Sequence, residues 1–365
     1  MVQAKPFKIA GQKIPPGQTR DIRLPVSERY DGDPVSLPMR VTVGRQAGPV
    51  LLVSAAVHGE EINGTGVIHE LMTDRPELIA GTLILVPAVN VFGFESQNRY
   101  MPDRRDLNRN FPGSATGSMT RRLAHVYFEQ VIRRSDYCVD LHTAAAQRTN
   151  YPNVRGDLSN ADVRRLARAF GCELMVHGKG PDGSLRREAV KAGCPTIILE
   201  AGEPLKIEPG VLEIGLRGVT NVMIDLGMIE GTLAKPSFQA RINKSTWVRA
   251  QVGGILRFHV RPGDLVEEGQ AVATNSTIFG EERNVLASPT DGIVLGMTTL
   301  PMVKPGEPVC HIALPSGSMQ RIRKARLGKT RDALHHQMRT DLATNITLAE
   351  READRAADAV REIEP

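Results

Sequence analysis

Cysteine, aromatic residues and long apolar runs are scarce in this chain of 365 residues, which has 4 Cys, 1 Trp and 4% aromatic residues. The cysteines show no Cys-x-x-Cys spacing, so we interpret them as buried reduced thiols and not as disulfides or metal ligands. No apolar run approaches the roughly 18 residues of a membrane span. The N-terminal stretch also lacks the apolar core of a signal peptide. We therefore expect a cytoplasmic protein with no membrane partner.

A strong net charge is also absent. The formal net charge is +5, and residues 321–331 contribute much of the excess, because they are basic and contain no acid. The nearly balanced remainder has few aromatic residues, which argues against a nucleic-acid partner. The length suits one large and one small domain. The sequence leaves the oligomeric state open and is compatible with a homo-oligomer.

Residues 1–245 alternate short apolar runs with helical patterns. The apolar runs do not alternate with polar residues, as is typical of strands covered on both faces; they are 49–57, 81–90, 137–142 and 196–202. The helical patterns lie at 62–73, 118–134, 159–170, 184–192 and 209–227. This order predicts an α/β sheet with parallel strands flanked by helices. Ligands bind such sheets beyond the carboxyl ends of the strands, where we expect His58, Asn90, His142 and Glu200 to converge.

Residues 246–315 have a different pattern, in which Gly and Pro separate short Val- and Ile-rich strands. The stretch 253–273 is loosely repeated by 291–313, since each has Gly-Ile, then Pro-Gly and an acid, then a closing strand. This predicts a small all-β domain that resembles the barrel-sandwich domains of biotinyl and lipoyl carriers. No Lys occurs between Lys244 and Lys304, so we expect a structural domain without an attached cofactor. Residues 316–365 are predicted to be a basic, then Ala- and Glu-rich tail, helical or flexible.

The strand-to-helix turn after residue 57 carries His58 and Glu61, and the end of another predicted strand carries His142. Imidazole nitrogen and carboxylate oxygen are good zinc ligands, and catalytic zinc typically takes three protein ligands. The His-x-x-Glu pair alone is a weak signal that a surface His beside solvated acids would match, and His142 alone could be a core histidine. Asp140 lies two residues before His142, on the same face of its strand, and could orient a ligating imidazole.

Two further stretches carry charges that need partners. Residues 98–113, NRYMPDRRDLNRNFPG, are dense in Arg, Asp and Asn. The Asn108-Arg109 pair beside Asp106 suggests an anion clamp, because Arg suits bidentate carboxylate recognition. Glu200 ends an apolar strand, where a carboxylate is costly unless it is paired or used.

The chain resembles the succinylglutamate desuccinylase/aspartoacylase family, a branch of the zinc carboxypeptidase-like fold. The resemblance rests on four motifs that follow one another in the family's order: His58-Gly-Glu-Glu61, Asp106-Leu-Asn108-Arg109-Asn-Phe-Pro-Gly, Asp140-Leu-His142 and Glu200. The resemblance covers roughly residues 20–313. It implies a mixed sheet flanked by helices, followed by the β-domain. It also implies one zinc per chain, held by His58, Glu61 and His142, with Glu200 as general acid/base.

The same resemblance implies the substrate contacts. Asn108 and Arg109 would hold a substrate carboxylate. An Arg that polarises the scissile carbonyl matches Arg99 best, and the spacing leaves Arg104 and Arg105 as alternatives. A further substrate-binding Arg matches Arg186 best. The predicted substrate is a small N-acyl amino acid.

The expected activity is therefore zinc-dependent removal of the acyl group from such a substrate. The alternative enzyme is a metallocarboxypeptidase for small or modified peptides. Peptidase relatives use a Tyr shortly before the catalytic Glu, and here no Tyr lies between Tyr151 and Glu200, which favours the deacylase. A non-catalytic binding module is disfavoured because all three ligand-type residues and Glu200 are retained.

Overall fold

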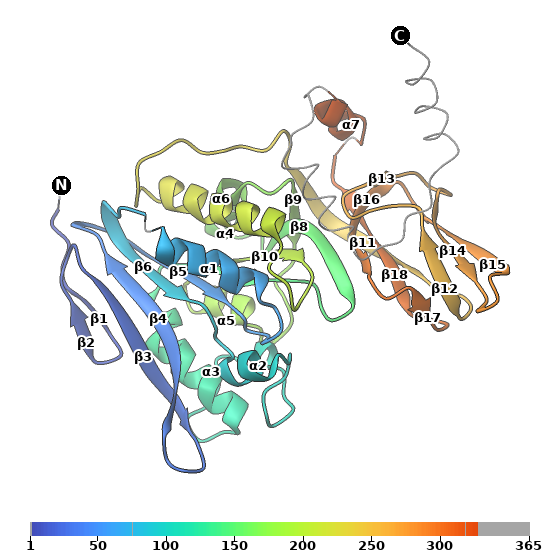
Figure 1. Ribbon diagram of the computed structural model, residues 1–365. Helices are drawn as coiled ribbons and strands as arrows, with labels where there is room; N and C mark the ends of the chain where they lie inside the picture. Colours follow the sequence, from blue (N-terminus) through green and yellow to red (C-terminus); the bar gives the residue numbers. More distant parts are fainter. Residues whose placement is uncertain (1, 75, 318, 328–365) are drawn as a thin grey trace, which may run out of the picture. The chain divides into compact units, whose positions relative to one another are not determined.

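The computed structural model describes residues 2–74, 76–317 and 319–327 (Figure 1). The chain divides into two compact units. Among the described residues, the first consists of residues 2–145 and 152–241, and the second of residues 146–151 and 242–327.

The first unit is built on a mixed sheet with the strand order β9-β8-β10-β7-β5-β6-β4-β3. The strands are β3 (Thr19–Glu28), β4 (Pro34–Val43), β5 (Gln46–Ala55), β6 (Ala80–Val86), β7 (Tyr137–His142), β8 (Arg148–Gly156), β9 (Leu174–His177) and β10 (Thr196–Gly202). The neighbours of β5 and of β7 are all parallel to them. The strands β4 and β3 extend the sheet in antiparallel pairing. The parallel arrangement predicted for the apolar runs is therefore confirmed, and a hairpin is added at the edge.

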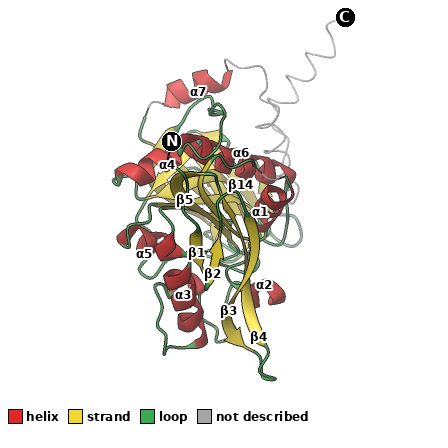
Figure 2. Ribbon diagram, turned by 90° about the vertical axis from the view of Figure 1, so that its left-hand side faces the viewer, coloured by secondary structure: helices red, strands yellow, loops and turns green. Residues whose placement is uncertain are grey.

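Helices cover both faces of this sheet (Figures 1 and 2). They are α1 (Asn63–Thr73), α2 (Val91–Ser96), η1 (Leu107–Arg109), α3 (Met119–Gln130), η2 (Ile132–Arg134), α4 (Ala161–Phe170), α5 (Leu185–Lys191) and α6 (Pro209–Asp225). α6 packs against both α1 and α4, and α1 approaches the sheet closely where Gly64 meets Ala55 and Leu141. On the other face, α3 and α5 bury Leu123 and Leu185 in one apolar core. A short hairpin, β1 (Phe7–Ile9) and β2 (Gln12–Ile14), precedes the sheet.

The second unit is dominated by short antiparallel strands. They are β11 (Ala240–Arg249), β12 (Gly254–Phe258), β13 (Leu265–Val266), β14 (Ala271–Ser276), β15 (Glu282–Ala287), β16 (Gly292–Thr298), β17 (Met302–Val303) and β18 (Pro308–Pro315). The repeat in the sequence reappears in the pairing, because β13 of the first copy pairs with β16 of the second and β17 of the second pairs with β12 of the first. Residues 148–150 also pair with β16.

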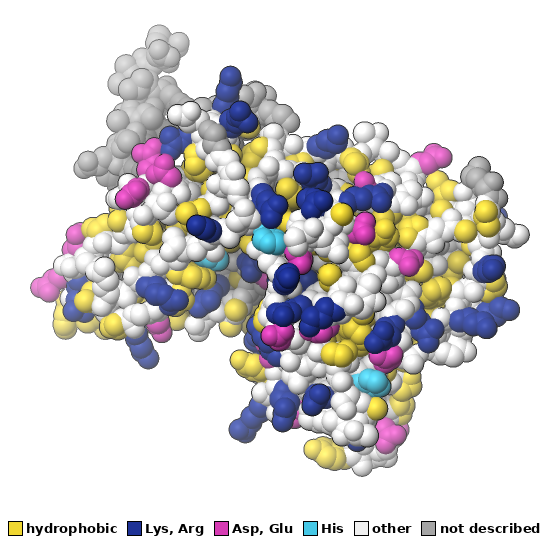
Figure 3. Space-filling model, turned by 180° about the vertical axis from the view of Figure 1, so that it is seen from behind, with side chains coloured by type: hydrophobic (Ala, Val, Ile, Leu, Met, Phe, Trp, Pro, Cys, Tyr) yellow, Lys and Arg dark blue, Asp and Glu magenta, His cyan; other side chains and the backbone are white. Residues whose placement is uncertain are grey.

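The described chain ends with α7 (Met319–Leu327). The Ala- and Glu-rich part of the predicted tail lies outside the described residues. In the part of the chain that the structure describes, no helix is both long and apolar enough to cross a membrane. Lys and Arg side chains crowd the middle of the face shown in Figure 3.

Candidate metal centre and active site

The turn between β5 and α1 is shaped to carry His58 and Glu61. Ala56 is fully buried and has a φ of 50°, a left-handed conformation that costs free energy in a residue other than Gly. Gly59 lies against the backbone of Gly93, so close that a Cβ at residue 59 would be 1.8 Å from the Gly93 carbonyl carbon. This position therefore requires glycine.

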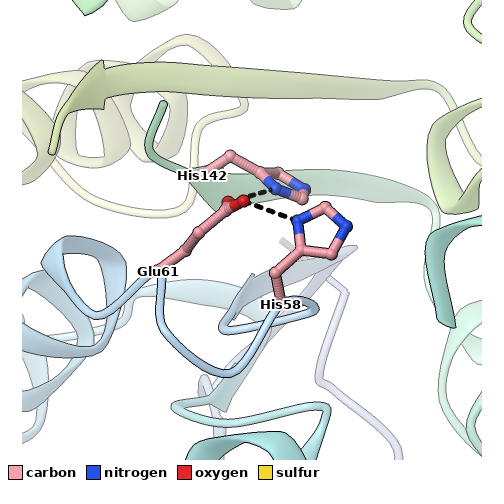
Figure 4. Close-up of side chains that lie close together, drawn as sticks. All are labelled: His58, Glu61 and His142. Carbon is pink, nitrogen blue, oxygen red and sulfur yellow. Dashed lines mark hydrogen bonds and ion pairs between the residues drawn. The ribbon is translucent and has the colours of Figure 1, made fainter. Parts of the chain in front are cut away.

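His58, Glu61 and His142 form one buried cluster (Figure 4). The Glu61 carboxylate lies between the two imidazoles, with Oε1 2.6 Å from His58 Nδ1 and Oε2 2.8 Å from His142 Nδ1. One ligand atom from each of the three residues lies within 4.8 Å of the other two. Two imidazoles and a carboxylate are the donor set that zinc accepts, so these residues could hold a metal ion.

The outer nitrogen of each imidazole is engaged by a second carboxylate. His58 Nε2 lies 3.2 Å from Asp106 Oδ1, and His142 Nε2 lies 2.7 Å from Asp140 Oδ2. Asp140 also accepts a hydrogen bond of 2.7 Å from the hydroxyl of Ser54. An acid on Nε2 fixes the ring orientation and leaves Nδ1 as the ligating atom. Both Nδ1 atoms point at Glu61, as this requires.

Arg99 is the arginine that reaches this cluster. It donates to Glu61 Oε1 and to Asp106 Oδ2, both at 3.2 Å. Of the two alternatives, Arg105 lies instead 3.8 Å from Asp103, and Arg104 occupies a turn with a φ of 60°. Asn90, which the strand-end argument placed with the site, instead caps α2 and bonds the Arg99 carbonyl through its amide.

Electrostatics within the cluster are dominated by the opposite charges. Burial alone would raise the pKa of Glu61, but His58 and His142 outweigh it and hold the pKa well below its usual range. Burial lowers the pKa of His142, yet Asp140 and Glu61 raise it well above its ordinary value. The imidazoles and the carboxylates thus favour one another's charged forms, and a bound cation would give the carboxylates the same compensation.

Glu200 lies opposite His142 in the sheet. The two are register partners on the adjacent parallel strands β10 and β7, so their side chains leave the same face of the sheet. The Glu200 carboxylate lies 3.6 Å from Arg155 Nη1, and its backbone carbonyl accepts from Asn153 Nδ2 at 3.2 Å. Strand pairing therefore places the Glu200 side chain on the same face of the sheet as His142, one strand away.

Asn108 and Arg109 lie in η1, directly after Asp106. The side-chain oxygen of Asn108 accepts from the backbone N–H of Leu185, so the amide group left for a ligand is a donor. Arg109 is about half exposed, and its Nη1 donates to the Asn108 carbonyl and lies 4.0 Å from Asp106 Oδ2. Both residues therefore present donors to an anion.

Arg186 follows Leu185 in α5, and its Nε and Nη1 are buried without a hydrogen-bond partner among the described residues. Burial, and then the neighbouring Arg155, lower the pKa of Arg186 to about 10, and Glu200 opposes this shift. Two guanidinium groups thus lie close together near Glu200, with buried donors available for an anion.

Ser54 and Asn153 have positions in this network that the sequence reasoning missed. Ser54 had a signal, because it is a hydroxyl residue within an apolar strand and a buried hydroxyl requires a partner. Asn153 has no comparable signal, because its role depends on how β8 is placed beside β10.

The fold and these side chains define a class: a mixed α/β protein with a candidate metal site of two histidines and one glutamate. Residues 47–226 match the family model of the succinylglutamate desuccinylase/aspartoacylase catalytic domain. This segment makes the chain a member of that family, a family of deacylases, and the resemblance seen in the sequence is confirmed.

Individual relatives agree with this assignment. The chain is 28% identical over 266 residues to the N-alpha-acetyl-L-2,4-diaminobutyric acid deacetylase of Halomonas elongata, a match covering 69% of this chain and 78% of the relative. A succinylglutamate desuccinylase/aspartoacylase from Rhodobacter sphaeroides has 26% identity and a TM-score of 0.71, over 82% of this chain and 95% of that one. An ectoine utilization protein from Ruegeria pomeroyi shows the same fold, with 24% identity and a TM-score of 0.71, over 81% and 95% of the two chains.

Proposed function

We propose that the protein is a zinc-dependent deacylase that hydrolyses the amide bond of a small N-acyl amino acid. The observation that carries this proposal is the cluster of His58, Glu61 and His142, in which an acid orients each imidazole and Glu200 lies in register with His142. The deacetylase activity named for the Halomonas relative supports the choice of an N-acyl amino acid.

The cluster's donors suit zinc, held by Nδ1 of each histidine and by Glu61. Zinc bound there would supply Lewis acidity and lower the pKa of a bound water toward about 7. Asp106 and Asp140 keep the two imidazoles in the ligating tautomer. Once Glu61 is engaged as a ligand, Arg99 is available to donate to the oxygen of the scissile carbonyl as negative charge develops there.

Glu200 is the proposed proton carrier. It accepts a proton from the attacking water and returns it to the leaving nitrogen, which general acid–base catalysis requires. Asn108 and Arg109 are proposed to bind the α-carboxylate of the amino acid and so to fix the amide against the water. The buried donors of Arg186, beside Arg155, favour a substrate with a second carboxylate over one with a plain acetyl and an apolar side chain.

The test is a deacylase screen with purified zinc-loaded protein over N-acetyl and N-succinyl amino acids, including N-α-acetyl-2,4-diaminobutyrate, beside a set of dipeptides. We expect turnover of acyl amino acids and little of dipeptides. The Glu200→Gln variant is the matched control, because it keeps the size of the side chain; we expect it to retain zinc and lose about a hundredfold or more in kcat. Dipeptide turnover without deacylation would favour the carboxypeptidase.

A further inference from the structure

A cleft with a volume of about 590 Å³ lies in the first unit between α4, the end of α6 and the segment 233–239. None of its lining residues belongs to the candidate active site. Its charged lining residues are Arg164, Arg165, Arg168 and Lys235, against the single acid Asp225. The cleft therefore has an excess of positive charge.

Asp225 compensates only one of these cations. It accepts from Arg165 Nε at 2.8 Å through its carboxylate and from Arg165 Nη2 at 2.7 Å through its carbonyl. Arg164 donates to a neutral acceptor, the carbonyl of Leu158. Within the described residues, neither Arg168 nor Lys235 has an acidic partner. Three positive charges thus remain available to a ligand.

These like charges repel one another unless an anion lies between them. Arg164 and Arg168 are four residues apart on α4, where like charges destabilise a helix. Lys235 adds a third charge from the opposite wall. Because the walls of a cleft have a low dielectric constant, they focus the field of such charges into the space between them.

The wall opposite α4 is held rigidly. The buried side chain of Asn221 bonds both the N–H and the C=O of Ala234 at 2.9 Å. Gln239 donates to the carbonyls of Arg168 and Cys172 at the other end of the segment. A ligand would therefore meet a cleft that is already formed and would pay little ordering entropy.

We propose that this cleft binds a small phosphorylated molecule. Arg164, Arg168 and Lys235 hold the phosphate group, since guanidinium groups match phosphate oxygens in a bidentate manner and an ammonium adds a point charge. The organic part lies against the half-buried apolar residues Leu233 and Phe238, which line the same cleft. The site is separate from the deacylase chemistry and does not depend on it.

The test is calorimetric titration of the full-length protein with inorganic phosphate and with AMP at constant ionic strength. We expect one saturable site per chain and tighter binding of AMP, because only AMP reaches the apolar wall. Loss of charge-assisted contacts in Arg168→Ala/Lys235→Ala should weaken binding about tenfold or more, with deacylase activity unchanged. The variant Lys13→Ala/Arg23→Ala removes the same charge from exposed positions outside the cleft and should bind as the wild type does.

Three results would overturn the proposal: no saturable binding to the wild type, equal binding by the Arg168→Ala/Lys235→Ala variant, or equal loss in the Lys13→Ala/Arg23→Ala variant. Equal affinity for phosphate and AMP would show that Leu233 and Phe238 do not contact the ligand. If the double variant does not fold, Lys235→Ala replaces it, because this exposed side chain carries no structural contact in the described chain, and a several-fold loss is then expected.

Discussion

Replacing Asp140 by Asn tests whether the acid behind His142 sets the affinity of the metal site. Asp140 is fully buried and accepts from Ser54 Oγ and His142 Nε2, both at 2.7 Å. Asn preserves the shape and one acceptor for the imidazole N–H, but it removes the charge that makes the ring a stronger ligand. Substitution of such outer partners typically costs 10–100-fold in metal affinity, which corresponds to about 1.4–2.7 kcal/mol.

The assay is a zinc titration against a chromogenic chelator, combined with thermal unfolding of the metal-free protein. Asp140→Asn should lower zinc affinity while the metal-free protein keeps most of its stability. Asp140→Ala should also lower stability, because it leaves two buried donors without an acceptor at about 1–3 kcal/mol each. Asp136→Asn is the control, since Asp136 is an exposed acid that accepts from the Val50 N–H just before the same strand. Zinc affinity equal to the wild type in Asp140→Asn would refute the reasoning.

Four further outcomes are expected. Elemental analysis should find about one zinc per chain, and full occupancy in His142→Ala would show that the ligand assignment is wrong. Capping the substrate's α-carboxylate as an amide should reduce kcat/KM by on the order of a hundredfold, because the charge-assisted contact to Arg109 is lost. Equal kinetics for the two substrates would show that Asn108 and Arg109 do not bind this carboxylate. Arg186→Ala should raise KM more for N-succinyl than for N-acetyl substrates of the same apolar amino acid, and a uniform change would argue against a second carboxylate site. Gly59→Ala should destabilise the protein by at least about 1–3 kcal/mol, because the new Cβ meets the Gly93 carbonyl carbon at 1.8 Å; an unchanged melting temperature would contradict that contact.

The sequence predicts the central strands well because their burial on both faces leaves a clear signature. The apolar runs became β5, β6, β7 and β10, with boundaries that differ by a few residues. The antiparallel β3 was not assigned, although its buried residues Ile22, Leu24 and Val26 alternate with exposed ones. Alternation within a strand does not say which neighbour it pairs with, so its place at the edge could not be derived.

The candidate site was predictable in its residue types and less so in its contacts. Spacing along the chain could not decide between Arg99, Arg104 and Arg105, because the loop that carries them is irregular. Only the structure shows that Arg99 donates a hydrogen bond to the Glu61 carboxylate. The pairing of Glu200 with His142 likewise depends on strand register, which apolar runs without alternation specify poorly.

The three proposed metal ligands come from the turn after β5 and from the end of β7, and these two strands are neighbours in the middle of the sheet. Metal binding would therefore be coupled to folding. A ligand that binds only the native state stabilises it in proportion to the logarithm of its concentration relative to Kd. Edge strands can fray locally, but central strands open only with most of the sheet. A metal ion held by His58, Glu61 and His142 would therefore link two central strands, β5 and β7. Its release by unfolding would require opening the whole sheet, and the amides of β7 would exchange more slowly with solvent when the ion is bound.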